Sequence, residues 1–360
     1  MKNYFRFFAA VSIILLACSC ARKPAFEWQA VGSPRFTPGE MDKISLFVDN
    51  GTPYVAFDDY TSSDKAAVMR FDGKAWGMAG TQGFSEGSAG YITLYVNKGM
   101  PYVGYDEVPE DGRHFVFPKA MKYDGTAWAP LSEDELPNSA MGSSLYVCDD
   151  GAYMLSSEKG ILKLSGSKWE AVGDEPFSKN TADFASLRVN AGVPYVIFSD
   201  TGGTKKAVVK KMENGKWTVV GNGGISQGEV CATSICFDGA TPYAAFVDKG
   251  NSGNACAMRY NGTAWEPLGK PGFSKGQSYY TTLCVDKGAL YLAYLDASLQ
   301  ANALKFNGKE WESIGTGLPK GELSYYTMTV SGSIPYIAFC QADKNGKDPK
   351  ATVMALRPVK

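Results

Sequence analysis

The sequence predicts an all-β protein, a seven-bladed β-propeller with four antiparallel strands per blade, and three repeated features support this. All seven tryptophans, from Trp28 to Trp311, recur at intervals of 41 to 52 residues. Each interval holds short segments rich in Val, Ile, Tyr, Phe and Thr, bounded by Gly, Asn, Asp or Pro, which is typical of strands. The first tryptophan segment has no strand segment before it, and the last period lacks a tryptophan segment. A period of about 40–50 residues with four strands is typical of a propeller blade.

The four strands of a period follow one another in a fixed order. The first has the form SLFVD (45–49) and the second the form PYVAF (53–57), with a turn such as NGTP between them. The third has the form AAVMRF (66–71), and the fourth contains the tryptophan, as in AWEPLG (264–269). No segment beyond the N-terminal one has a sustained helical period, so the class is all-β.

A short turn joins the third strand to the fourth and recurs in closely similar form. The copies are RFDGKAW (70–76), KYDGTAW (122–128), RYNGTAW (259–265) and KFNGKEW (305–311). Asp-Gly and Asn-Gly tolerate positive φ angles, so we expect a two-residue type I′ turn here. The tryptophan that follows should then fill the space between neighbouring blades.

The number of segments predicts how the ring closes. First-strand and third-strand segments each occur seven times, but only six tryptophan segments follow a third strand. EWQAVG (27–32) is a fourth strand without a third before it, and ATVMAL (351–356) is a third strand without a fourth after it. We therefore expect a propeller over residues 26–360, with blade 7 completed by residues 26–32, which removes a free sheet edge. Blade 3, with the divergent segment AYMLSSEKGILKLSG, should be irregular.

Residues 1–17 are typical of a secretory signal, because a basic start precedes an apolar run of 11 residues, too short to span a bilayer. The end of this run resembles a bacterial lipoprotein box. The resemblance implies lipid attachment at Cys18, with Cys20 as the second candidate, and a short tether over residues 18–25. The protein would then be exported and anchored in the bacterial cell envelope, at the outer membrane or cell surface. Signal cleavage without a lipid is the alternative.

Charge and residue counts argue against several classes of partner. Without residues 1–17 the chain has 34 basic and 37 acidic residues and no basic block, so we expect no binding to nucleic acid. The single histidine, His114, and the absence of a Cys-x-x-Cys pair argue against a zinc site or a Ser-His-Asp triad. No metal or cofactor is expected. The six cysteines outside the N-terminal segment should be free, packing as small apolar residues.

The repeat resembles the tandem propeller repeats of many secreted or surface-anchored bacterial proteins. The segments GFSEGSAGYITLYV, PYVAF, ATVMAL and NGTAWEPLG carry this resemblance, which covers essentially residues 26–357. It implies a bacterial lipoprotein of propeller architecture, in a family that has no single activity.

Two polar positions recur in almost every period. A hydroxyl begins each first strand, which indicates a structural bond between blades: Ser45, Thr93, Ser144, Ser186, Ser234, Thr282 and Thr327. An acid follows most second strands: Asp59, Glu107, Asp200, Asp248 and Asp296, with Glu158 as a rough match. Recurrence favours a role in setting the turn. Acids at a defined separation could also bind a ligand or cleave a glycoside, so Asp59, Glu107 and Asp296 are candidate ligand-binding residues.

The residues just before the hydroxyls differ from period to period, and the site prediction is based on these differences. Aromatic residues stand there in some periods: Tyr91, Phe184, Tyr279, Tyr280, Tyr325 and Tyr326. In a propeller these loops share one face, around the central channel, with the loops after the second strands, of which 107–118 and 341–350 are the longest. Tyrosines at a rigid channel mouth suit stacking on sugar rings or docking of a peptide. Packing between blades is the alternative for each tyrosine.

Together these features predict a monomeric, non-catalytic binding or scaffolding module for a glycan or a protein, in contact with the membrane only through its lipid. One alternative is a carbohydrate-active hydrolase or lyase that uses acids on the same face. Such an enzyme would need two carboxylates about 5–10 Å apart in an open pocket. The other alternative is an envelope assembly factor whose partner docks on the propeller rim.

Overall fold

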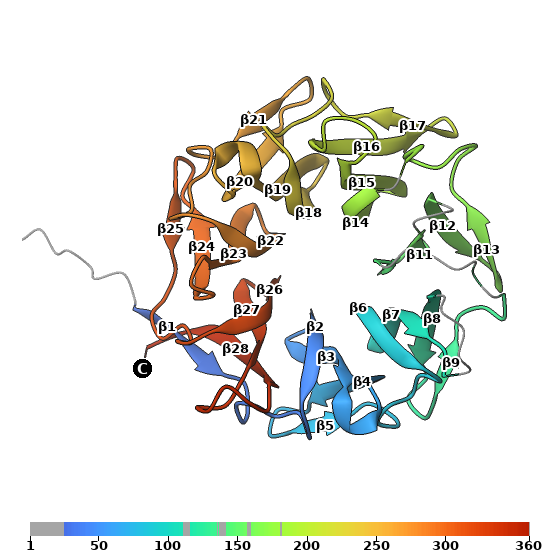
Figure 1. The fold of residues 1–360 in the computed structure, drawn as a ribbon, viewed down its shortest axis with the longest axis vertical. Helices are drawn as coiled ribbons and strands as arrows, with labels where there is room; N and C mark the ends of the chain where they lie inside the picture. The colour runs from blue at the N-terminus through green and yellow to red at the C-terminus, as the bar shows by residue number, and fades with distance from the viewer. Residues whose placement is uncertain are drawn as a thin grey trace, which may run out of the picture.

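The computed structural model describes residues 25–110, 116–134, 136, 142–156, 160–180 and 182–359. These residues form seven four-stranded antiparallel sheets arranged as blades around a central axis (Figure 1). The predicted seven-bladed propeller is therefore confirmed. Residues 1–24, with the predicted signal and Cys18, lie outside the described residues, and so does His114.

In blades 1 to 6 the strands follow in sequence from the channel outward. Blade 1 consists of β2 (Met41–Asp49), β3 (Thr52–Asp59), the 3-10 turn η1 (Tyr60–Ser62), β4 (Lys65–Phe71) and β5 (Trp76–Met78). Blade 2 consists of β6 (Ser88–Asn97), β7 (Met100–Val108), β8 (Phe117–Tyr123) and β9 (Trp128–Pro130). Blade 3 consists of β10 (Ser144–Cys148), β11 (Gly151–Ser156), β12 (Gly160–Ser165) and β13 (Lys168–Ala171). Blade 4 consists of β14 (Ala182–Asn190), β15 (Val193–Asp200), β16 (Ala207–Glu213) and β17 (Lys216–Val219).

The last three blades complete the ring. Blade 5 consists of β18 (Val230–Asp238), β19 (Thr241–Asp248), the 3-10 turn η2 (Lys249–Asn251), β20 (Asn254–Tyr260) and β21 (Trp265–Pro267). Blade 6 consists of β22 (Ser278–Asp286), β23 (Ala289–Asp296), β24 (Ala301–Phe306) and β25 (Trp311–Ser313). Blade 7 consists of β26 (Leu323–Ser331), β27 (Ile334–Gln341), β28 (Lys350–Pro358) and β1 (Phe26–Ala30). Blade 3 keeps four strands, but its first strand has 5 residues, whereas β2 has 9 and β6 has 10.

The N-terminal strand closes the ring as predicted. β1 pairs antiparallel with β28, with Trp28 opposite Leu356 (Figure 1). The backbone N–H of Val31 then donates to the carbonyl of Val353 at 2.9 Å. The outermost strand of blade 7 is thus supplied from the other end of the propeller sequence, and β28 does not present a free edge.

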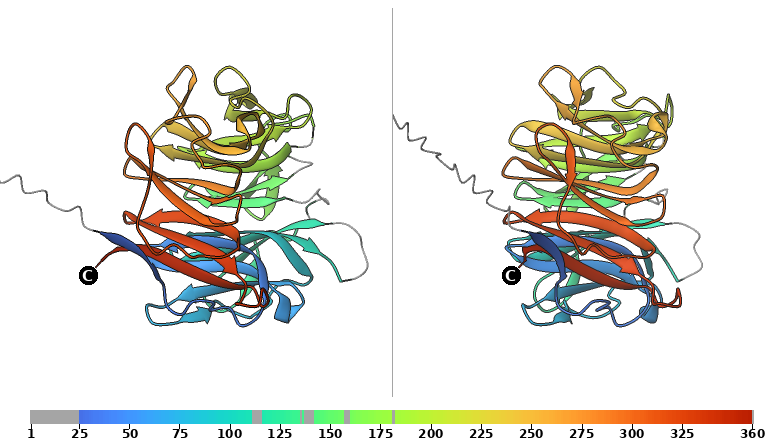
Figure 2. Two further views of the ribbon diagram at one scale, coloured as in Figure 1. Left: turned by 60° about the vertical axis from the view of Figure 1, so that its left-hand side comes forward. Right: turned by 90° about the vertical axis from the view of Figure 1, so that its left-hand side faces the viewer.

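Strand direction divides the loops between two faces of the ring. The connections from each fourth strand to the next first strand share one face with the connections from second to third strands, and we call this the loop face. Phe26, where β1 begins, pairs with Pro358 at the end of β28 and therefore lies on the opposite face (Figure 2). Among the described residues, no helix is long and apolar enough to cross a bilayer.

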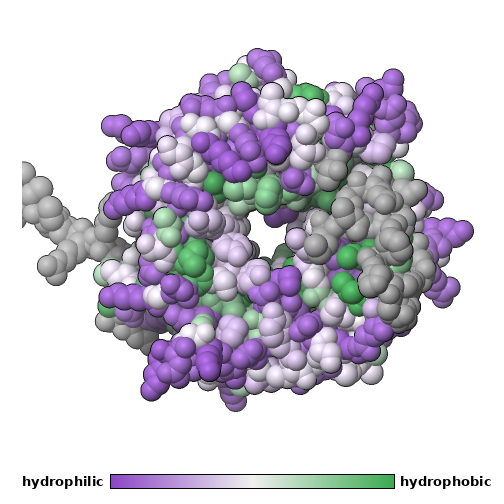
Figure 3. Space-filling view, in the orientation of Figure 1, coloured by the Kyte–Doolittle hydropathy of each residue, from purple (hydrophilic) through white to green (hydrophobic). Residues whose placement is uncertain are grey.

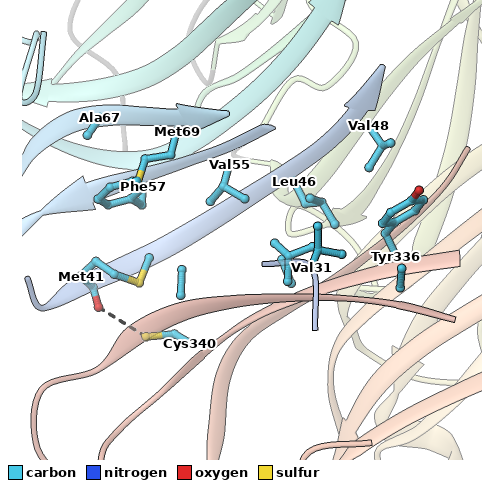
Figure 4. Close-up of a cluster of buried hydrophobic side chains, with 14 residues drawn as sticks. Val31, Met41, Leu46, Val48, Val55, Phe57, Ala67, Met69, Tyr336 and Cys340 are labelled. Atoms are coloured by element: carbon cyan, nitrogen blue, oxygen red, sulfur yellow. Dashed lines mark hydrogen bonds between the residues drawn. The ribbon is translucent and has the colours of Figure 1, made fainter. Parts of the chain in front are cut away.

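The core lies between blades, because alternate side chains of each strand face opposite neighbours. Val55 and Phe57 of β3 pack toward blade 7, against Tyr336 and Cys340 (Figure 4). The alternating residue Ala56 packs toward blade 2 instead. Each sheet is therefore buried on both sides and is stabilised by its two neighbours.

The tryptophans link neighbouring blades by packing and by hydrogen bonds. Each described indole N–H bond runs to a carbonyl three residues after the preceding tryptophan: Trp28 to Ile314 (3.0 Å), Trp76 to Val31 (2.7 Å), Trp128 to Ala79 (2.8 Å), Trp217 to Val172 (3.2 Å), Trp265 to Val220 (2.8 Å) and Trp311 to Leu268 (2.9 Å). The predicted position between blades is confirmed, and the neighbour is the preceding blade. Trp28 makes this contact across the closure.

The predicted type I′ geometry of the turn before the tryptophan is wrong for the close copies. In RFDGKAW, Gly73 has a φ of 98°, but Asp72 does not have a positive φ. Instead, the Oδ1 of Asp72 accepts the N–H groups of Lys74 and Ala75 at 2.7 and 2.8 Å. The same side-chain bonds recur in the other close copies, at Asp124, Asn261 and Asn307. The looser copy MENGKW does have two consecutive positive φ angles, at 214–215.

The cysteines outside residues 1–24 are all free thiols, as expected for packing residues. Cys256 and Cys340 are buried, and the other four are half-buried. Burial raises the pKa of the Cys256 thiol to about 11 and that of Cys340 to about 12, so both are protonated at neutral pH.

Candidate ligand site at the channel mouth

Each first strand carries an irregularity where it enters the sheet from the loop face. In six blades an extra residue shifts the pairing of the first and second strands, forming a β-bulge. Two positions before the recurring hydroxyl, one residue in each of the seven blades has a left-handed φ: Lys43 (38°), Tyr91 (49°), Gly142 (118°), Phe184 (51°), Ala232 (51°), Tyr280 (53°) and Tyr325 (50°). We call these seven residues the bulge ring.

The bulge ring stores backbone strain in residues that are poorly suited to it. A left-handed conformation costs an L-residue roughly 1–2 kcal/mol, and aromatic residues seldom adopt it. Tyr91, Phe184 and Tyr280 are nevertheless aromatic, and 46%, 55% and 38% of their surface is exposed. Packing does not explain an exposed aromatic side chain on a strained backbone. Bulges redirect side chains beside functional sites, and strain of this kind concentrates there.

Two bulge-ring tyrosines begin a continuous polar network that crosses three blades. The rings of Tyr280 and Tyr325 lie 5.6 Å apart. The hydroxyl of Tyr325 donates to Oδ2 of Asp42 at 2.9 Å. The Nζ of Lys43 lies 3.4 Å from that oxygen and 3.1 Å from Oδ2 of Asp58. We call Tyr280, Tyr325, Asp42, Lys43 and Asp58 the rim array.

Asp58 is the most perturbed acid of the rim array. Its side chain is almost fully buried, and its Oδ1 accepts the backbone N–H of Asp42 at 2.8 Å. Burial raises its pKa to about 6, although Lys43 attracts the charged form. Burial alone would lower the pKa of Lys43, but Asp58 and Asp42 outweigh this effect and raise it. The pair therefore holds a lysine that stays charged beside a carboxyl that can take up a proton near pH 6.

Asp106 occupies the same position in blade 2. It is buried, and its Oδ2 accepts the N–H groups of Gly142 and Ser143 at 2.7 and 3.2 Å. Burial raises the pKa of Asp106, and those bonds oppose the rise. Its Oδ1 is also buried and has no hydrogen-bond partner among the described residues.

Asp42, Lys43, Asp58 and Asp106 were not predicted as site residues. The signal that could have found the two buried acids is their departure from the repeat. In the other five blades the same position holds Ser157, Ser199, Val247, Leu295 or Cys340. Two buried carboxylates in neighbouring blades, where other blades have neutral residues, point to a local function.

A small pocket connects the rim array to blade 2. It has a volume of about 200 Å³, and its lining includes Lys43, Asp58, Tyr60 and Tyr91. Pockets that enclose a whole drug-sized ligand measure roughly 300–1,000 Å³. This pocket is therefore suited to part of a larger ligand that lies across the channel mouth, which is visible as the central hollow in Figure 3.

The predicted aromatic residues divide between the site and the core. Tyr91, Phe184, Tyr280 and Tyr325 belong to the bulge ring, and Tyr279 is exposed beside Tyr280. Tyr326 is only 2% exposed and packs in the core between blades 6 and 7, so the alternative of packing between blades describes it and it is not part of the channel mouth. It follows the bulge, and its side chain therefore points to the opposite side of the strand.

Four of the recurring acids, Asp59, Glu107, Asp248 and Asp296, accept backbone N–H groups of loop residues, which supports the structural interpretation at those positions. Asp59 is buried, and its Oδ1 accepts the N–H of Thr61 at 3.0 Å. Glu107 is buried and accepts the N–H groups of residues 86 and 87, both at 3.1 Å. Asp296 accepts the N–H of Ser298 at 2.9 Å. These bonds occupy Asp59 and Glu107, and Asp296 uses its Oδ1 on its own turn, so none of the three belongs to the rim array.

Three of the seven recurring hydroxyls, those of Ser45, Thr93 and Ser234, join blades as predicted. The Oγ of Ser45 accepts the N–H of Leu94 in the next blade at 3.0 Å. Equivalent bonds run from Leu145 to Thr93 (3.0 Å) and from Leu283 to Ser234 (3.1 Å). These bonds fix the first strands against one another and so hold the channel mouth rigid.

Within the described ranges, no group of three or more His, Cys, Asp or Glu side chains is arranged to hold a metal ion. The groups described at the channel mouth are aromatic faces, the carboxyls of Asp42, Asp58 and Asp106, and the ammonium of Lys43. This combination can stack on a flat apolar surface and can exchange hydrogen bonds with polar groups at its edge.

The fold and the channel mouth place the chain in the class of seven-bladed β-propellers. No family model matches the chain, and no curated protein matches it either. Among solved structures, it is similar to a protein of unknown function from Dyadobacter fermentans, with a TM-score of 0.54 and 14% identity over 94% of this chain and 99% of that one.

Two other similar structures are described as sugar complexes. One is the SapL1 lectin in complex with alpha methyl fucoside, with a TM-score of 0.51 and 12% identity over 80% of this chain and 99% of that one. The other is Trypanosoma rangeli sialidase in complex with sialic acid, with a TM-score of 0.51 and 11% identity; the match covers 93% of this chain but only 59% of the sialidase. Identities this low show a shared fold alone. The propeller part of the predicted resemblance is confirmed, and the lipoprotein part stays a prediction.

Proposed function

We propose that the protein is a non-catalytic binding module that holds a carbohydrate at the channel mouth. The observation that carries this proposal is the bulge ring, which presents exposed aromatic side chains on strained backbone around one opening. The fold is shared with a lectin and a sialidase that were solved with sugars, which favours a glycan over a peptide.

The side chains of the rim array match the two kinds of surface on a sugar ring. A pyranose has an apolar C–H face, which stacks on a tyrosine ring, and a rim of hydroxyls, which pair with charged groups. Tyr280 and Tyr325 supply adjacent rings. Asp42 and Lys43 lie next to them and offer an acceptor and a donor. One sugar unit on the tyrosines would therefore place its hydroxyls over the charged pair.

The direction of the N-terminal strand supports a role in the bacterial cell envelope. β1 begins on the face opposite to the loop face, where the bulge ring lies (Figure 2). A lipid on Cys18, joined through a short tether, would attach the propeller to the membrane from that opposite face. The channel mouth would then point away from the membrane, toward glycans outside it.

A glycan array tests the proposal with the purified wild-type domain and a Tyr280→Ala/Tyr325→Ala variant. We expect the wild type to bind a defined set of glycans and the double variant to bind them at least 10-fold more weakly, a difference of about 1.4 kcal/mol. Val219→Ala, at an exposed position on the outer strand of blade 4, serves as control and should bind like wild type. Equal binding by the wild type and the folded double variant would refute this location.

A second candidate, glycoside hydrolysis, is favoured by one observation. Asp42 and Asp58 both contact the Nζ of Lys43, so their carboxylates are no farther apart than the roughly 5–10 Å that glycosidases use. The raised pKa of Asp58 also suits a general acid. Against this, Asp58 is almost fully buried and already bonded. Turnover of any glycan by the wild type, together with its loss in Asp58→Asn, would establish the enzyme and refute the binding module.

A further inference from the structure

A second ring of side chains lines the channel deeper than the bulge ring. These residues stand two positions after the recurring hydroxyls, and we call them the channel collar: Phe47, Tyr95, Tyr146, Arg188, Cys236, Cys284 and Thr329. All seven are partly buried, while the residues before them, from Leu46 to Met328, are buried. The first strands that carry them are the strands next to the central channel (Figure 1), which indicates that the exposed part of the collar borders it. The collar lies four residues beyond the bulge ring, or about 13 Å along the strand at 3.2–3.4 Å per residue.

Successive members of the collar touch one another around part of the ring. The ring centres of Phe47 and Tyr95 are 5.7 Å apart, and those of Tyr95 and Tyr146 are 5.0 Å apart. The guanidinium of Arg188 lies 5.4 Å from the ring centre of Tyr146. From Phe47 to Arg188 the collar is therefore a contiguous surface rather than a set of isolated side chains.

Arg188 is the one charged member of the collar, and its charge is not balanced. Its Nη1 donates to the carbonyl of Leu187 at 2.7 Å. Among the described residues, no carboxylate forms an ion pair with it. A guanidinium has five N–H donors in a planar fork, so most of its donors remain for a ligand.

The neighbours of Arg188 do not supply a negative charge at neutral pH. Burial raises the pKa of Tyr146 and Cys284 to about 12, although Arg188 opposes the rise. Burial likewise raises the pKa of Tyr95 and Cys236. The guanidinium of Arg188, in blade 4, reaches over the ring of Tyr146 in blade 3. The phenol and thiol groups around it stay protonated and can donate.

We propose that the channel collar binds a small oxyanion, a carboxylate or a phosphate group, on the guanidinium of Arg188. The fork of the guanidinium matches two oxygens of either group, and the ring of Tyr146 lies beside it. An anion here neutralises a cation that has no carboxylate partner among the described residues. The site is distinct from the rim array, because the collar lies well below the mouth and uses other side chains.

Thermal unfolding tests this proposal with inorganic phosphate and acetate as probes. At constant ionic strength, with chloride replaced by the probe, we expect a saturable rise in the Tm of the wild type by a few degrees. Arg188→Gln should show no saturable rise, and Arg188→Lys should show a smaller one, because it keeps the charge but lacks the fork. Arg259→Gln removes a surface arginine paired with Glu266 and should respond like wild type.

Each arm of the experiment has a decisive result. A rise at lower concentrations of phosphate than of acetate assigns the site to phosphate, and the reverse order assigns it to carboxylate. An equal rise in the wild type and in folded Arg188→Gln would be a general salt effect and would overturn the proposal. Absence of any rise in the wild type with either probe would overturn it as well. Titration calorimetry with the same probes provides a second readout, in which the affinity of Arg188→Gln should fall at least 10-fold.

Discussion

At the scale of single residues, the informative positions are those where one blade differs from the others. Tyr280 and Tyr325 could be predicted as site residues because small residues replace them elsewhere in the repeat. Asp58 satisfies the same criterion, because most other blades have a neutral residue at its position. The neighbouring acid Asp59 recurs in most blades and is therefore the more obvious candidate. Lys43 could not be recognised, because its role depends on a bulge that the sequence does not reveal.

The strain of the bulge ring can be measured directly at Phe184, which has a φ of 51° and an exposed side chain. We expect Phe184→Gly to be more stable than Phe184→Ala by about 1 kcal/mol, because glycine adopts a left-handed φ without a steric cost. Urea unfolding provides the free energies of unfolding. At the ordinary strand position Val219 the order should be reversed, with the alanine variant more stable than the glycine variant. The same order at both positions would show that Phe184 is not strained.

The raised pKa of Asp58 predicts a pH dependence of stability. The folded protein holds the proton up to about pH 6, whereas the unfolded chain loses it near 3.8. The stability from proton binding is therefore complete below about pH 4 and is lost as the pH rises through 6. Relative to Asp58→Asn, the free energy of unfolding of the wild type should fall by up to about 3 kcal/mol between pH 4 and 7.

A control of opposite sign is available in the same blade. Backbone N–H groups of Ala75 and Lys74 lower the pKa of Asp72, so its contribution is lost as the pH falls. The difference between wild type and Asp72→Asn should therefore stay nearly constant from pH 4 to 7 and should fall only below about pH 4. A difference between wild type and Asp58→Asn that is constant from pH 4 to 7 would contradict the raised pKa.

At the scale of elements, the four strands of each blade were predictable because every blade repeats the same apolar alternation and the same turn residues. The detailed geometry of the turn before the tryptophan could not be predicted in this way. Asp-Gly and Asn-Gly fit both a type I′ turn and a loop closed by the side chain of the first residue. At Asp72 the side chain forms two hydrogen bonds to backbone N–H groups, and these decide between the two.

This mechanism predicts which substitutions the turn tolerates. Asp72→Asn should leave the free energy of unfolding at neutral pH almost unchanged, because Asn performs the same role at positions 261 and 307. Asp72→Ala should lower it, since two N–H groups lose their acceptor. Chemical denaturation measures both values. Equal losses in the two variants would mean that the charge of Asp72, rather than its acceptor oxygen, holds the turn.

At the scale of the whole molecule, seven blades and their closure followed from counting segments, because each blade contributes the same set. The arrangement of the channel mouth and the channel collar did not follow, since each depends on side chains from several blades. Arg188 illustrates this: in the sequence it is one of eight scattered arginines, and only the ring brings it next to Tyr146.

Closure by β1 predicts the effect of its removal. Deleting residues 26–32 exposes the edge of β28, which then offers unpaired backbone groups to a second molecule. We expect this variant to form dimers or larger species in size-exclusion chromatography with light scattering, and to unfold at a lower temperature than wild type. Trp28→Phe keeps the strand and loses only the indole hydrogen bond to Ile314, so it should elute like the wild type. A deletion variant that elutes and melts like the wild type would show that β1 is dispensable.

The pairing of β1 with β28 also determines when the protein can be completed. A ribosome synthesises β1 more than 300 residues before β28, so the strand made first must wait for the strand made last. Single blades can form early, but no nascent chain can finish the ring before its final strand emerges. The polypeptide therefore remains an open ring, with β1 unpaired by β28, until synthesis is nearly over.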